Sequence, residues 1–131
     1  MGRGRGFQID RKDNWVYSML ILQPDHITSA MFIEALRQLR KKKGDQPAFG
    51  RLRLESFHEG LSIQTMHIGP YASEPVTIET MDAYAHAHGY MMHGKHHEIY
   101  LGNPLRAQPE KLKTILRHPV KPDKVRESAG T

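Results

Sequence analysis

The sequence contains no cysteine among its 131 residues. This absence excludes a disulfide framework, a thiolate nucleophile and every zinc or iron–sulfur site that needs cysteine ligands. It fits the reducing environment of the cytoplasm, which is the location we expect. A single domain of this length buries enough surface to fold without disulfides or a structural metal.

Long hydrophobic runs are also absent. The longest apolar stretch, Met19–Leu22, is far shorter than the ~18 residues that a membrane span requires, so no membrane association is expected. Met1–Gly6 carries arginine and glycine without an apolar segment behind it, which excludes a signal peptide. No glycine-rich phosphate loop and no metalloprotease motif occurs, so no cofactor is predicted.

Nine histidines are present, but their spacing argues against a metal site. His86 and His88 lie two residues apart on a predicted helix and therefore point in different directions, and Gly94 interrupts the later group around His93 and His97. We therefore predict no bound metal.

Positive charge exceeds negative charge, with 19 Lys and Arg against 14 Asp and Glu. The excess lies in the Arg-Gly start, in Arg40–Lys43 at the end of a predicted helix, and in the tail that begins at Lys121. Basic residues in a last helical turn complement the helix dipole. No interleaving of aromatic and basic residues accompanies the charge, so a nucleic-acid partner is not expected.

Hydrophobic periodicity predicts an α+β fold with an antiparallel sheet and helices on one face. A flexible leader (1–14) precedes one domain (15–120), and a disordered tail (121–131) follows. The helix with a cap at Thr28 or Ser29 ends before Gly44, and a second helix starts at Ser73 and ends at Gly89. Strands are predicted at residues 15–22, 51–57, 61–68, 96–101 and 113–118.

Strand alternation places Glu98 and Tyr100 on one face of their strand and Ile99 and Leu101 on the other. We expect the apolar side to lie under the helices, which leaves Glu98 and Tyr100 on an open face. If one alternating set of side chains from each of the other predicted strands also lies on that face, a carboxylate sits in a pocket for a flat apolar ligand. Alternatively, Trp15 and Tyr17 complete a core and Glu98 is a solvated strand residue. The candidate ligand-binding residues are Trp15, Tyr17, Met19, His67 and Glu98.

Four segments resemble the GyrI-like small-molecule-binding family, and most closely its stand-alone branch that hydrolyses cyclopropanoid genotoxins. They are Phe57–Leu61, Met66–Tyr71, Gly94–Leu101 and Lys111–Arg117. The resemblance implies two strand-helix-strand-strand units with a ligand cleft between them and a buried glutamate, which matches Glu98. It also implies that Tyr71, Trp15 and Tyr100 are candidates for the cleft wall.

If the activity of that branch is retained, Glu98 acts as the general base, and Tyr71 or Tyr100 donates a hydrogen bond to the substrate carbonyl. The rival reading is a binding module without turnover, in which Glu98 is the counter-charge for a planar cation. A protein-interaction role is the third alternative.

The stand-alone relatives carry a further N-terminal portion, so we expect the first unit to be incomplete in this sequence. An unpaired sheet edge and an apolar face with Trp15, Tyr17 and Met19 would then need cover. A homodimer is the expected way to supply it.

Overall fold

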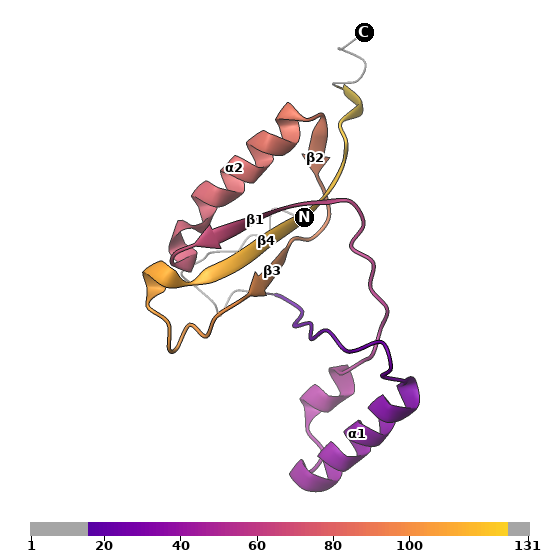
Figure 1. The fold of residues 1–131 in the computed structure, drawn as a ribbon. Helices are drawn as coiled ribbons and strands as arrows, with labels where there is room; N and C mark the ends of the chain where they lie inside the picture. Colours follow the sequence, from indigo (N-terminus) through magenta and orange to yellow (C-terminus); the bar gives the residue numbers. More distant parts are fainter. Residues whose placement is uncertain (1–15, 126–131) are drawn as a thin grey trace. The chain divides into compact units, whose positions relative to one another are not determined.

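The computed structural model describes residues 16–125, which divide into two compact units. One unit comprises Tyr17–His58 and the other contains the described residues from Glu59 to Val125. Figure 1 shows the elements of both. The Glu59–Val125 unit carries the sheet, and together the elements confirm the predicted α+β class with an antiparallel sheet.

The Tyr17–His58 unit consists of helix α1 (Ser29–Lys43), the short 3-10 helix η2 (Pro47–Arg51) and connecting segments. Thr28 caps α1, because its hydroxyl oxygen accepts a hydrogen bond from the backbone N–H of Met31 at 3.2 Å. Four basic residues, Arg40–Lys43, fill the last turn and complement the helix dipole. This helix was predicted with correct ends.

Two predicted strands of this region do not form. Residues 16–24 and 52–61 have no regular secondary structure, so the strand predictions for 15–22 and 51–57 are wrong over the residues that the structure describes. The alternation of Leu52 and Leu54 with arginine is real, but alternation alone does not make a strand. A strand also needs a neighbour to accept its backbone hydrogen bonds, and none pairs with either segment between residues 16 and 125.

The sheet is built around one long strand, β4 (Lys113–Pro122). Strand β1 (Ser62–Ile68) pairs antiparallel with it on one edge, with Thr65 opposite Leu116. On the other edge, β3 (His97–Tyr100) pairs with the first half of β4, and the short β2 (Tyr90–Met92) pairs with its end. Strand β4 thus continues through Lys121 and Pro122, the first residues of the segment predicted as a tail.

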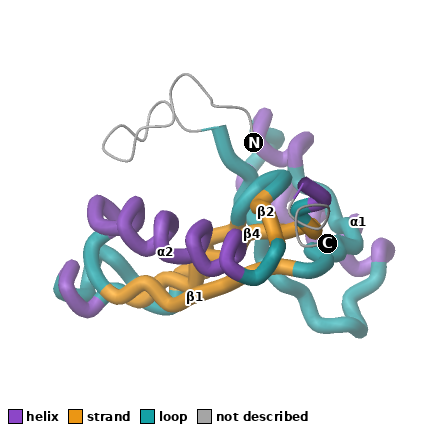
Figure 2. The backbone as a smooth tube through the Cα atoms, turned by 90° about the horizontal axis from the view of Figure 1, so that it is seen from above, coloured by secondary structure: helices purple, strands orange, loops and turns teal. Residues whose placement is uncertain are grey.

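Helix α2 (Glu74–Ala87) follows the 3-10 turn η3 (Tyr71–Ser73) and lies along one face of this sheet, as Figures 1 and 2 show. It buries Met81 and Ala85 on the same side as Leu116 and Val120 of β4. Gly89 ends the helix with a φ of 81°, a conformation that a residue with a side chain rarely adopts. A last 3-10 turn, η4 (Pro109–Lys111), leads into β4, so β1, α2, β3 and β4 form one strand-helix-strand-strand unit.

Candidate functional site

A cavity of about 270 Å³ lies between helix α2 and the β3–β4 side of the sheet. Its surface is mainly apolar, and the polar residues that line it are two glutamates, two histidines and Arg117. Few polar groups in an apolar cavity are typical of a small-molecule site. The lining residues are Glu74, Ile78, Met81, Met92, His96, Glu98, Leu116, Arg117 and His118.

Glu74 is the cavity residue that sequence reasoning missed. It is the first residue of α2 and only 4% exposed, although an N-terminal glutamate is normally read as a solvated dipole partner. The signal was present in the spacing, because Glu74, Ile78, Met81 and Ala85 recur at helical intervals and share the buried face.

The carboxyl groups of Glu74 and Glu98 meet inside the cavity. Burial, a hydrogen bond to Glu98 and the charge of Glu98 raise the pKa of Glu74 to about 8. At neutral pH Glu74 is therefore protonated and donates this hydrogen bond to the Glu98 carboxylate. Its Oε1 atom is buried and has no hydrogen-bond partner among residues 16–125.

Tyr100 and Tyr71 lie against this pair. The Tyr100 hydroxyl donates a 2.6 Å hydrogen bond to Glu98 Oε2. The ring of Tyr71, from η3, meets the Tyr100 ring edge-to-face with centroids 5.7 Å apart. Burial is the largest cause that raises the pKa of both phenols, followed by the hydrogen bond to Glu98 for Tyr100 and by nearby carboxyl charge for Tyr71, so both keep their protons at neutral pH.

The position of Glu98 corrects the predicted open face. Glu98 and Tyr100 do share one face of β3, as predicted, but this is the face that α2 covers and not the open one. Glu98 is paired in register with buried Leu116, and it meets Glu74 of α2, so it points under the helix. Tyr100 is likewise opposite buried Thr114. Polarity misled the prediction, because a carboxylate that shares a proton with a second carboxyl group is stable on the covered side.

His67, a predicted ligand-binding residue, is buried on β1 and holds the turn that leads into α2. Its Nε2–H donates to the carbonyl oxygen of Pro70 at 2.9 Å, and its Nδ1 accepts from the Thr77 hydroxyl at 2.7 Å. The Ser73 hydroxyl also lies 3.1 Å from Nε2. His67 is not in the cavity lining, and its contacts position the segment that carries Tyr71 and Glu74.

Two further predicted ligand-binding residues, Tyr17 and Met19, lie in the irregular segment of the other unit, with 68% and 81% of their surfaces exposed. Their assignment to the ligand site stays a prediction. Trp15 lies outside the described residues, so its assignment stays a prediction.

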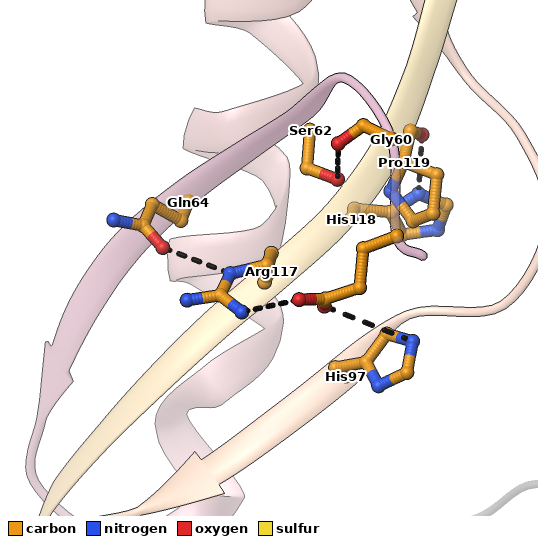
Figure 3. Close-up of polar contacts among 8 residues, drawn as sticks. Gly60, Ser62, Gln64, His97, Arg117, His118 and Pro119 are labelled. Carbon is orange, nitrogen blue, oxygen red and sulfur yellow. Dashed lines mark hydrogen bonds and ion pairs between the residues drawn. The ribbon is translucent and has the colours of Figure 1, made fainter. Parts of the chain in front are cut away.

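The opposite face of the sheet carries a polar cluster, drawn in Figure 3. Arg117 of β4 donates to Glu59 Oε2 at 2.6 Å and to Gln64 of β1 at 2.9 Å. His97 Nε2 of β3 lies 3.9 Å from the other oxygen of Glu59. The cluster thus links strands β1, β3 and β4 and the turn before β1 on the face of the sheet away from the cavity.

A wider, more open depression of about 370 Å³ lies in the Tyr17–His58 unit. It is lined by Arg40, Asp45, Gln46, Pro47 and Gly50, and Arg40 and Asp45 form an ion pair of 3.2 Å within it. The charged groups of this depression pair with each other, whereas two carboxyl groups line the mainly apolar cavity beside α2, so the chemistry points to that cavity.

Within residues 16–125, no three histidine, aspartate or glutamate side chains gather closely enough to hold a metal ion. Over the same residues, no helix has the length and apolar character needed to cross a membrane.

Comparison with known proteins identifies the family of this chain. Residues 26–121 match the family model described as the GyrI-like small molecule binding domain. The chain belongs to this family. The resemblance found in the sequence is thereby confirmed, and a small molecule is the partner that the family description supports. A comparison with functionally curated proteins gives no match.

Solved structures from Listeria innocua agree with this assignment. A protein described as a hydrolase is 40% identical, with a TM-score of 0.69, over 76% of this chain and 52% of its own. An uncharacterized conserved protein is 42% identical, with a TM-score of 0.71, over 76% of this chain and 50% of its own. The chain therefore spans about half the length of these structures.

Proposed function

We propose that this GyrI-like domain binds planar hydrophobic or cationic small molecules in the cavity beside α2 and hydrolyses cyclopropanoid electrophiles there. The observation that carries the proposal is the Glu74–Glu98 pair, a neutral acid hydrogen-bonded to a carboxylate in an apolar cavity. Such a pair supplies an acid and a base side by side at the same pH. The hydrolase description of a similar Listeria structure supports the reaction class.

The substrate class is a cyclopropane joined to a conjugated dienone. Glu98 takes a proton from water as the water oxygen attacks a cyclopropane carbon, and the ring C–C bond breaks. The electron pair of that bond moves through the dienone to the carbonyl oxygen as the ring becomes a phenol. Glu74 donates its proton to this oxygen, so the product is the substrate plus one water molecule.

The pair then resets itself. After the reaction Glu98 holds the proton from water and Glu74 is ionised, and the hydrogen bond between them returns the proton to Glu74. Tyr100 orients the Glu98 carboxylate through its 2.6 Å hydrogen bond. Tyr71 is a second candidate donor for the carbonyl oxygen of the substrate. General acid–base catalysis of this kind increases the reaction rate roughly a hundred- to ten-thousand-fold. Ring strain in the substrate therefore supplies much of the driving force.

A binding module without turnover is the second candidate, because an apolar cavity with one carboxylate also suits a flat cation. The two functions differ in a single measurement. The parent spirocyclopropyl cyclohexadienone is incubated with the protein, and formation of hydroxyphenylethanol is followed by chromatography. We expect product above the uncatalysed background, and its absence would favour the binding module.

Two substitutions test the roles of the pair. Glu98→Gln removes the base and should abolish the catalysed reaction, and Glu74→Gln should lower it by at least about tenfold. The matched control is Glu79→Gln, which makes the same change on an exposed position of α2. Turnover by Glu98→Gln equal to the wild type would remove Glu98 from the mechanism.

A further inference from the structure

Two histidines stack on each other in the cavity wall. His96, just before β3, and His118 of β4 have ring centroids 6.0 Å apart and planes inclined by only 16°. Both rings line the cavity that also contains Glu74 and Glu98. Together they make part of the cavity wall aromatic, next to the carboxyl pair.

The geometry fixes the tautomer of one of these rings. His118 Nδ1 donates a 3.0 Å hydrogen bond to the Pro119 carbonyl oxygen, shown in Figure 3, so its neutral form carries the lone pair on Nε2. His118 also neighbours Arg117, whose guanidinium is paired with Glu59 on the opposite face of the sheet. The ring orientation of His118 is therefore set by the backbone of its own strand.

The groups around His96 act on its charge in opposite directions. Burial lowers the pKa of His96 most, and the positive forms of His118 and His97 lower it further, whereas the carboxylate of Glu98 on β3 raises it. Glu74 of α2 faces the same cavity but is uncharged at neutral pH. The net effect lowers the pKa of His96, so its ring is neutral at neutral pH.

We propose that the His96–His118 pair is a specificity-determining stacking platform that selects flat ring systems and, through its charge, decides between cationic and uncharged ligands. The inference rests on the proposed function to the extent that the cavity is the ligand site. Neutral imidazole rings stack on a planar ligand and leave the Glu98 carboxylate to balance a positive charge. Protonated rings still stack but repel a cation.

The platform predicts a pH dependence that differs between ligands of the same shape. Acidification from pH 7.5 to 5.5 raises the fraction of imidazole that is protonated, which increases the positive charge beside the ligand. We expect the affinity for a planar cation to fall by about fivefold over this range. An uncharged ligand of the same shape should change by less than about twofold. A cation without a flat ring should bind weakly at both pH values.

The probes are the methylquinolinium cation, uncharged methylnaphthalene and cyclohexyltrimethylammonium, each measured by titration calorimetry at pH 7.5 and 5.5. In His96→Phe/His118→Phe the rings remain but cannot be protonated, so methylquinolinium should bind equally well at both pH values. In His96→Leu the flat surface is lost, and both planar probes should bind at least about fivefold more weakly. His86→Phe, on an exposed position of α2, is the matched control and should behave as the wild type.

The same loss of cation affinity at pH 5.5 in wild type and in the double phenylalanine variant would overturn the charge role. Unchanged binding of planar probes to His96→Leu would overturn the stacking role. The single variant His96→Phe, at a partly exposed ring, repeats the test if the double variant does not fold. Absence of dienone hydrolysis with planar binding intact would refute the proposed reaction while leaving the platform in place, so the two failures are distinguishable.

Discussion

Glu74 on α2 donates its proton in a hydrogen bond to Glu98 on β3, so the pair joins two layers of the fold. The helix and the edge strand each supply one carboxyl group, and both line the same mainly apolar cavity. Ionising both groups would place two negative charges in an apolar space. Stability and activity should therefore depend on this single proton.

The first prediction concerns stability. Glu74 has a folded-state pKa of about 8, above the value of about 4.5 for an exposed glutamate, so the folded protein holds a proton that the unfolded chain releases between these values. Stability therefore falls as pH rises from about 4.5 to about 8. Glu74→Gln removes this loss, and we expect it to unfold later in urea at pH 8.5, by a free energy on the order of 1–2 kcal/mol. A variant that is less stable than wild type at pH 8.5 would contradict the burial of an acid here, and Glu79→Gln serves as control.

The second prediction concerns the pH dependence of hydrolysis. The acid of the pair must be protonated for turnover, so kcat/KM for the dienone should decline above about pH 8 as Glu74 ionises. In Glu74→Gln the residual rate should no longer show this alkaline decline. The measurement is kcat/KM between pH 6 and 9.5, with the uncatalysed rate subtracted at each pH. An alkaline limb that survives in the variant would assign the proton to another group.

Sequence reasoning predicted both helices and three of the strands because their signals are local. The Thr28 cap, the glycine after each helix, and the strands around residues 61–68, 96–101 and 113–118 all agree with the structure. The failures involve partners that a local pattern does not contain. Residues 51–57 alternate like a strand but have no pairing strand between residues 16 and 125. Glu74 was missed because only Glu98, distant in sequence, explains its burial.

A third prediction isolates the contact between Tyr100 and Glu98. Tyr100→Phe removes the hydroxyl that donates at 2.6 Å and keeps the ring that packs against Tyr71. We expect a loss of about tenfold in kcat with the fold unchanged, since a carboxylate without this donor is less well oriented. Circular dichroism and dienone turnover are compared with those of Tyr84→Phe, which alters an exposed tyrosine of α2. Equal losses in both variants would show that the effect is not specific to the Glu98 contact.

A fourth prediction concerns the cluster on the other face of the sheet. Arg117 links Glu59 and Gln64, and through Glu59 it reaches His97. Arg117→Met keeps the aliphatic stem but leaves Glu59 without its closest cation, so stability should fall by about 1–3 kcal/mol. Lys113→Met removes an exposed charge from the same strand and should have little effect. Urea unfolding measures both, and equal midpoints for the two variants would show that the cluster contributes nothing.

The last prediction is that two chains associate through β1. This strand is the edge of the sheet formed by the described residues, and Met66 and Ile68 on it are exposed. An edge strand offers a row of unpaired backbone groups, and antiparallel pairing with a second copy satisfies them through a symmetric contact. We expect sedimentation equilibrium to give a dimer at micromolar concentrations. Met66→Lys should shift it toward the monomer, whereas Val76→Lys, the same change on exposed α2, should not. A folded wild-type monomer at these concentrations would refute the pairing.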